Sequence, residues 1–153
     1  MKKKIILITV ILIVLLLIIV YFKTRTTMIC TYTNSNDIYY IETKYKVKYK
    51  NDKVLSLYTK EVIMSDDDNM LKEYKSTLDL VYSKYNELKY YNNNMRIEDN
   101  KLISETKVNY EKIDIEEFLK VDESNINIVR NKQVSLKKIR KIYKENGARC
   151  TYR

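Results

Sequence analysis

Two cysteines and a scattered set of carboxylates are the side chains of this sequence that could do chemistry. Cys30 and Cys150 are the only cysteines, and the chain contains no histidine. Without histidine, the Ser-His-Asp and Cys-His arrangements that activate a nucleophile are excluded. Zinc sites built from cysteine and histidine are excluded by the same counts. Because Gly147 is the only glycine, a glycine-rich loop that cradles phosphate is excluded as well.

Paired carboxylates are the catalytic arrangement that the composition still allows, because one can act as an acid and the other as a base. The candidates are Asp66, Asp67, Asp68, Glu116, Glu117, Asp122 and Glu123. Each also has an ordinary explanation at a helix start or on the surface, where acidic groups satisfy free N–H groups. A calcium loop needs alternating oxygen ligands and a glycine, and the aspartate run offers neither. We therefore predict no enzyme activity, no cofactor and no metal site.

The two cysteines are expected to form a disulfide. Thiols in an exported domain tend to oxidise. A Cys30–Cys150 bridge would close a loop of about 120 residues, worth about 4–5 kcal/mol in the chain-entropy model. It would also tie the last segment to the first strand. Two alternatives stay open: two unpaired thiols, and lipid attachment at Cys30, although the preceding residues 27–29 lack the small residue that such a site needs.

Export depends on the hydrophobic segment at residues 5–22, which is interrupted only by Thr9. Eighteen residues at about 1.5 Å each cover roughly 27 Å, close to the hydrocarbon thickness of a bilayer. No small-residue cleavage pattern follows at residues 23–28, so we expect an uncleaved signal anchor. The three lysines of residues 1–4 outweigh the two basic residues after the segment, which places the amino terminus inside the cell.

These features predict a single-pass protein of the cell membrane with four parts. They are a cytoplasmic tip (1–4), a transmembrane signal anchor that contacts membrane lipid (5–22), a spacer (23–28) and an extracellular domain (29–153). Five of the 29 basic residues flank the anchor, which leaves 24 against 20 acidic ones. Such a mixed surface with a mild basic bias favours anionic lipid heads or acidic wall polymers. It argues against nucleic acid, which requires clustered charge on one face.

The clearest element of the outer domain is a strand over residues 39–50. One face carries Tyr39, Ile41, Thr43, Tyr45, Val47 and Tyr49, and the other Tyr40, Glu42, Lys44, Lys46, Lys48 and Lys50. Period-two alternation predicts one buried face and one wet face. Asn51-Asp52 predicts a turn into a second strand at 54–64. Lys44, Lys46 and Lys48 mark a surface that could face a ligand, and a merely solvated face is the alternative.

The remaining pattern predicts helices and a second hairpin. Met70, Tyr74, Leu78, Val81, Tyr85 and Leu88 follow helical spacing, and segments 95–97 and 102–110 predict a hairpin across 98–101. Asp114 with Glu117 predicts a capped helix at 115–120, and 126–130 predicts a brief strand. Ser135 predicts the start of a last helix at 136–146, ended by Gly147. The fold class is α+β, an antiparallel sheet of two hairpins packed against amphipathic helices, preceded by the transmembrane helix.

Three short segments carry a resemblance to a known family. The first, Lys50-Asn51-Asp52-Lys53-Val54, is similar to a charged turn between the first two strands of that family. Val108-Asn109-Tyr110-Glu111-Lys112-Ile113-Asp114 is similar to its strand running into a short helix, and Val134-Ser135-Leu136-Lys137-Lys138 to the start of its last helix. Over about residues 38–147 the chain resembles the YehR-like family of small bacterial surface lipoproteins. That resemblance implies an exported, membrane-tethered α+β domain with no established activity. The family attaches through a lipidated cysteine, whereas here a full-length hydrophobic segment precedes Cys30.

We therefore expect a noncatalytic, membrane-anchored extracellular domain that binds an unidentified protein or an anionic envelope polymer. One alternative is a single-pass membrane regulator or assembly factor that acts through its helix, although residues 5–22 lack the small-residue stripe favoured at packed transmembrane interfaces. Another alternative is a carboxylate-dependent envelope enzyme. It would require two partly buried carboxylates about 5–10 Å apart in a cleft.

Overall fold

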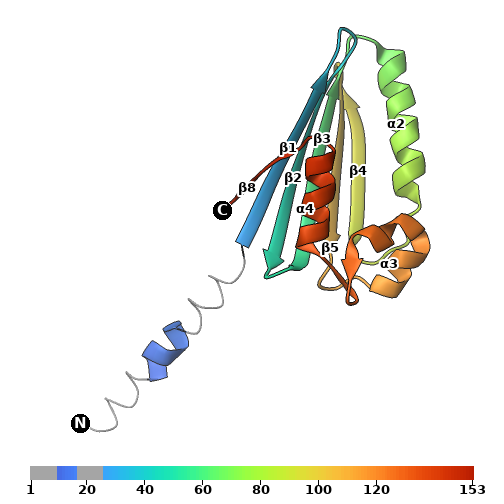
Figure 1. The fold of residues 1–153 in the computed structure, drawn as a ribbon. Coiled ribbons are helices and arrows are strands. Elements are labelled where there is room, and N and C mark those ends of the chain that lie inside the picture. Colours follow the sequence, from blue (N-terminus) through green and yellow to red (C-terminus); the bar gives the residue numbers. More distant parts are fainter. Residues whose placement is uncertain (1–9, 17–25) are drawn as a thin grey trace.

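The computed structural model describes residues 10–16 and 26–153 (Figure 1). Residues 10–16 are helical, and their apolar side chains are exposed. Within the described parts of the chain, no helix is both long and apolar enough to cross a bilayer. The expected anchor at 5–22 lies mostly outside the described residues, as do the tip at 1–4 and the start of the spacer, so these assignments stay predictions.

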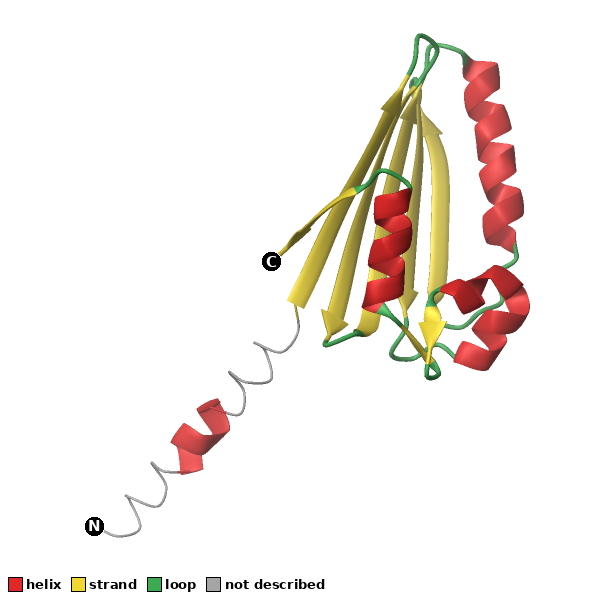
Figure 2. Cartoon of the chain, in the orientation of Figure 1, coloured by secondary structure: helices red, strands yellow, loops and turns green. Residues whose placement is uncertain are grey.

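Residues 26–153 form an antiparallel sheet with helices on one of its faces (Figures 1 and 2). The strand order is β4-β5-β3-β2-β1-β8, and every neighbouring pair is antiparallel. The strands are β1 (Thr26–Ser35), β2 (Tyr40–Lys50), β3 (Lys53–Met64), β4 (Tyr91–Glu98), β5 (Lys101–Asn109) and β8 (Arg149–Tyr152). A separate small hairpin joins β6 (Val129–Arg130) to β7 (Gln133–Val134). The predicted α+β class with an antiparallel sheet is confirmed.

Both predicted hairpins are present, β2–β3 and β4–β5. Their turns contain Asn51 at φ 54° and Asp99 at φ 52°, a left-handed conformation that Asn and Asp tolerate. The hairpins do not join in chain order, however, because β3 pairs with β5 and leaves β4 at the edge. β4 also begins at Tyr91, four residues before its predicted start.

The helices are α2 (Asp68–Ser83), α3 (Ile115–Val121) and α4 (Leu136–Glu145), with a short 3₁₀ helix at Glu123–Asn127. The predicted caps are confirmed: Asp67, Asp114 and Ser135 each accept a backbone N–H from the first turn of α2, α3 and α4. Gly147 adopts φ 84° after α4, the left-handed conformation expected of it.

Two predicted elements were wrong in extent. α2 ends at Ser83, so Tyr85 and Leu88 lie in tight turns, where Tyr85 and Leu88 each donate an N–H to the carbonyl three residues earlier. These turns bring the chain back to the sheet, and both side chains pack into the main core. The segment 126–130 is only partly extended, because its first residues belong to the 3₁₀ helix Glu123–Asn127. Asp122 caps that helix by accepting the N–H of Ser124.

The predicted disulfide is present and joins the edge strand β8 to its neighbour β1. β8 pairs with β1 so that Cys30 and Cys150 lie directly opposite each other, and their sulfurs are bonded at 2.04 Å. The strand β8 had no counterpart in the sequence prediction. β1 begins at Thr26, inside the expected spacer, and its Met28 is fully buried.

The two core clusters lie on the face of the sheet that carries the helices. Leu136 and Ile139 of α4 belong to one cluster with Met28 and Val47. Beneath α2, Leu71 joins Ile63 and Leu102 in a second cluster. In β2 the predicted inner residues are buried or half-buried and the lysines between them are exposed, so the predicted alternation is confirmed. The opposite side, which we call the open face, is not covered by any helix of the described residues (Figure 1).

Candidate functional site

The sheet register brings residues from four strands into two rows on the open face. In the first row Lys46 faces Tyr58, which faces Lys107, which faces Asn92. In the second row Lys48 faces Ser56, which faces Asn109, and the backbone N–H of Asn109 donates to the Tyr90 carbonyl at 3.0 Å. Side chains opposite each other in a sheet are direct neighbours, so each row is continuous across the strands.

A hollow of about 560 Å³ lies between these rows. It is lined by Lys46, Lys48, Ser56, Leu57, Tyr58, Tyr90, Tyr91, Asn92, Lys107, Val108 and Asn109. Leu57, Val108 and Tyr91 face one another across three strands and form the floor, while their side chains point to the core. The hollow exists because short residues, Ser56 and two asparagines, stand beside long lysine and tyrosine side chains.

The lining is strongly positive. It contains three lysines and no carboxylate, and none of Lys46, Lys48 and Lys107 forms an ion pair with another described residue. The Lys107 ammonium lies 5.9 Å from the centroid of the Tyr58 ring. These positive groups are therefore available to an incoming anion.

Tyr90 forms the rim of the hollow at its β4 end. Its side chain is 42% exposed and its backbone adopts φ 70°. The ammonium groups of Lys89 and Lys112 lie 5.2 Å and 5.6 Å from the ring centroid, a distance at which a cation is attracted by the ring face. The rim therefore adds two further positive charges near the lining.

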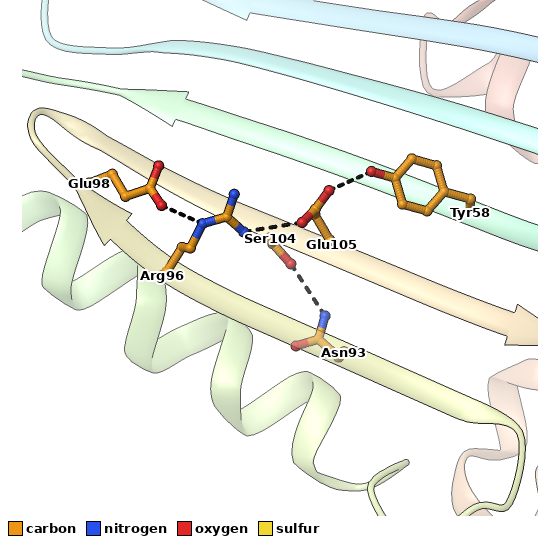
Figure 3. A network of polar contacts seen from close by, with 6 residues as sticks. All are labelled: Tyr58, Asn93, Arg96, Glu98, Ser104 and Glu105. Carbon is orange, nitrogen blue, oxygen red and sulfur yellow. Dashed lines mark hydrogen bonds and ion pairs between the residues drawn. The ribbon is translucent and has the colours of Figure 1, made fainter.

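A chain of polar contacts fixes the other aromatic wall, Tyr58 (Figure 3). The Tyr58 hydroxyl donates to one oxygen of Glu105 at 2.5 Å, and Arg96 donates to the other oxygen at 3.1 Å. Arg96 also donates to Glu98 at 2.6 Å. The Tyr58 hydrogen bond, followed by that of Arg96, lowers the pKa of Glu105, and the same bond raises the pKa of Tyr58. Tyr58 is thus held as a neutral phenol, and the nearest carboxylate is already engaged.

The same two strands are also joined on the covered face. There the side-chain amide of Asn93 donates to Ser104 at 3.3 Å (Figure 3). The same amide donates to Thr106 at 2.8 Å. Because β4 is an edge strand, these contacts and the Arg96–Glu105 pair hold it in register with β5. The position of Asn92 and Tyr90 in the hollow follows from that register.

The predicted lysine surface is only partly the lining. Lys46 and Lys48 line the hollow, whereas Lys44 is exposed on the same face beside it. The sequence prediction did not include Tyr58, Lys107 or Tyr90. Counting outward from the turn at Asn51 would have paired Lys46 with Leu57, because a register shift between Lys48 and Tyr49 is what places Tyr58 opposite Lys46. Lys107 depends on the β3–β5 pairing, which has no local signal.

The candidate catalytic carboxylates are not brought together. Asp66–Asp68 lie at the start of α2, and the others lie around α3 at the far end of the sheet (Figure 1). Asp67 and Asp122 act as caps, and Asp66, Asp68, Glu116, Glu117 and Glu123 are exposed. On the covered face the half-buried carboxylate is instead Glu61, which was not among these candidates. Its position in the inward alternation of β3, two residues before Ile63, could have identified it.

Comparisons with known proteins agree on the domain. A family model described as "Protein of unknown function (DUF1307)" matches residues 28–149. The NMR structure of the Escherichia coli YehR protein is 18% identical with a TM-score of 0.53, covering 80% of this chain and 89% of that one. An NMR structure from Streptococcus pneumoniae TIGR4 is 16% identical with a TM-score of 0.52, covering 84% and 86%. No curated protein matches this sequence. The expected YehR-like fold is confirmed, and at these identities the structures show the fold alone.

Proposed function

We propose that this chain, which belongs to the DUF1307 family of proteins of unknown function, is a noncatalytic binding domain for an anionic polymer of the cell envelope. The polymer binds in the open-face hollow, with its negative groups on Lys46, Lys48 and Lys107. Tyr58 and Tyr90 pack against its uncharged parts, since tyrosine offers both an apolar ring and a polar tip.

The observation that carries this proposal is the charge of the lining. Three lysines surround one hollow that holds no carboxylate, on a chain whose outer part has nearly balanced charges. Ordinary solvated surfaces intersperse both signs, whereas a recess lined by one sign concentrates ions of the opposite sign. A repeating anion also gains from the open sheet, because it can extend past the hollow toward Lys44 and Lys60, which lie opposite each other in β2 and β3.

A location outside the membrane is part of the proposal. The Cys30–Cys150 disulfide supports an oxidising compartment, and the apolar sequence of residues 5–22 supports a tether in the bilayer. Protease added to intact cells is expected to remove residues 26–153 and to spare the amino terminus. Full protection of the domain in intact cells, with digestion only after lysis, would contradict the proposed location.

Binding is tested with the full-length protein in an uncharged detergent and a poly(glycerol phosphate) probe. Replacing Lys46, Lys48 and Lys107 by glutamine is expected to weaken binding on the order of 100-fold, from about 1 kcal/mol per lysine near an anionic surface. The matched control replaces the exposed Lys72, Lys120 and Lys144 by glutamine and changes net charge equally. Equal losses in the two variants, or no binding by the wild type, would contradict the proposal.

A further inference from the structure

A second cavity lies on the covered face of the sheet, between α2 and α4. It measures about 400 Å³ and is lined by Tyr32, Ile41, Thr43, Tyr45, Glu61, Tyr74, Tyr143, Asn146 and Ala148. An adjoining cavity of about 260 Å³ shares Tyr45, Glu61 and Tyr143 with it. Glu61 therefore stands at the junction of two recesses, on the side of the sheet opposite to the open-face hollow.

Glu61 is the carboxylate of this cavity and lacks a cationic partner. The register places it between Thr43 of β2 and Ser104 of β5, and the Thr43 hydroxyl donates to it at 3.2 Å. No lysine or arginine of the described residues forms an ion pair with it. Burial raises the pKa of Glu61, and the Thr43 hydrogen bond offsets this in part. A half-buried carboxylate with one hydrogen bond is costly for the fold unless a cation joins it.

Besides Glu61, Thr43 and Asn146, the polar lining consists of tyrosine side chains. Tyr45 stacks on Tyr143 of α4 with ring centroids 4.0 Å apart, and Tyr74 comes from α2 on the other side. Burial, followed by the charge of Glu61, raises the pKa of Tyr45 and raises that of Tyr82 to about 12. The phenols near Glu61 are thus neutral, so they offer oxygen atoms and aromatic rings without competing charge.

We propose that this tyrosine-lined cavity binds a small organic ammonium ion whose charged group meets Glu61. The carboxylate supplies the counter-charge, phenol oxygens accept N–H groups, and aromatic rings attract the alkyl groups that carry the positive charge. A neutral apolar molecule would leave Glu61 desolvated without compensation. An anion would be repelled by it.

A metal ion fits this cavity poorly. Calcium takes six to eight oxygen ligands, with carboxylates prominent among them, and the cavity lining contains Glu61 as its one carboxylate. Among residues 10–16 and 26–153, no group of three His, Cys, Asp or Glu side chains is arranged to hold a metal. An organic cation requires only one counter-charge and gains from the aromatic walls, so it matches the lining better.

The proposed site is independent of the polymer-binding proposal. The two recesses lie on opposite faces of the sheet and attract ions of opposite sign. Lys46 and Lys107 belong to the open-face hollow and do not line this cavity. Failure of either proposal therefore leaves the other standing, and the two binding assays distinguish them.

The test is calorimetric titration of the full-length protein in dodecyl maltoside and an amine-free buffer near neutral pH. The probes are choline and n-butylammonium, and the comparison ligand is 3,3-dimethyl-1-butanol, the uncharged analogue of choline. We expect saturable binding of at least one ammonium probe, with the uncharged analogue at least about tenfold weaker. Glu61→Gln keeps the side-chain shape and is expected to weaken binding at least about tenfold, as loss of a charge-assisted contact. Glu42→Gln, at an exposed position of β2, is the matched control and should bind as the wild type does.

Three results would overturn the proposal: no saturable binding of either ammonium probe, equal affinity for the uncharged analogue, or undiminished affinity in Glu61→Gln. If Glu61→Gln does not fold, as judged by circular dichroism, the comparison of charged and uncharged probes on the wild type decides. Tyr74→Leu then supplies the second variant, because it removes one aromatic wall and should reduce the affinity for ammonium several-fold. An unchanged affinity in that variant would contradict the aromatic part of the site.

Discussion

The two faces of this sheet are made by the same strands and have opposite character. On β2, Lys46 points to the open face and its neighbour Tyr45 points to the helices. On β3, Tyr58 lines the cationic hollow, and Glu61, three residues later, lines the tyrosine cavity. Period-two alternation separates two chemistries by one residue, so one thin layer presents a positive recess to one side and a negative recess to the other.

The faces also differ in which of their charged groups have partners. On the open face Glu105 is engaged by Tyr58 and Arg96, which leaves the lysines without partners. On the covered face Glu61 has only the Thr43 hydroxyl. Solvent stabilises the lysines at little cost, whereas burial destabilises the charged form of Glu61. A ligand of either face that binds only the folded state would stabilise the fold according to its own affinity and concentration.

Removal of the disulfide is expected to give the largest difference between an effect on stability and an effect on polymer binding at the open face. Cys30 is buried on the covered face, and β8 has no other tie of comparable strength to β1. Replacing both cysteines by serine should lower the free energy of unfolding by about 4–5 kcal/mol through the unfolded state. Polymer affinity should not change, because the hollow is built on β2, β3, β5 and β4. Urea unfolding followed by circular dichroism measures the first, with Thr33→Ser on the exposed end of β1 as control. A loss below about 1 kcal/mol would contradict the expected contribution.

The next effect should come from α2, which covers only one face. Leu71 is fully buried against Ile63 and Leu102, so Leu71→Ala should cost about 2–5 kcal/mol. It should also weaken ammonium binding, because α2 carries Tyr74. Leu80→Ala, at a position of the same helix that is 71% exposed, should change stability by less than about 0.5 kcal/mol. A comparable loss of polymer binding in Leu71→Ala would show that the two faces are not independent.

Local features of the fold were predictable because they depend on neighbouring residues. The caps Asp67, Asp114 and Ser135 accept nearby backbone N–H groups. The turn residues Asn51 and Asp99 adopt a left-handed conformation that their side chains tolerate, and the alternation of β2 follows from the period of a strand. The end of α2 and the 3₁₀ turn after Asp122 were missed. After Ser83 a local turn ends the helix although the hydrophobic spacing continues, and after Asp122 a 3₁₀ helix occupies the start of the segment predicted as a brief strand.

Features that depend on strand order were not predictable from one sequence. Alternation assigns a face to each residue but does not specify which strand lies beside it. Lys46 and Lys48 could be assigned to the wet face, whereas Lys107 reaches them only because β3 pairs with β5. In the same way, Glu61 could be assigned to the inner face, but the cavity around it requires Tyr74 and Tyr143 from two helices distant in sequence.

The pH dependence of stability should sharpen the contrast through Glu61. Because the folded-state pKa of this carboxyl is raised, its favourable contribution is fully present below its unfolded pKa and is lost as pH rises through the folded value. The titratable groups that interact with it are the phenols Tyr45, Tyr74 and Tyr82, all with raised pKa values, so these phenols stay neutral in mildly acidic solution and Glu61 titrates. Glu61→Gln should therefore gain stability relative to wild type as pH rises from 4 to 7. A difference that is constant over that range in urea unfolding would contradict the raised pKa.

The smallest effect is expected on the open face, from Tyr58→Phe. The Tyr58 hydrogen bond is the largest cause that lowers the pKa of Glu105, and Arg96 is the next. Removing the hydroxyl should raise the pKa of Glu105 while Arg96 keeps it below its ordinary value, with no measurable change in folding. Carboxyl ¹³C NMR titration measures this shift, and Tyr40→Phe, on the same face at the opposite end of β2, should leave it unchanged. If the pKa of Glu105 stays as in the wild type, Tyr58 is not held by that carboxylate, and the aromatic wall of the hollow loses the contact that fixes it.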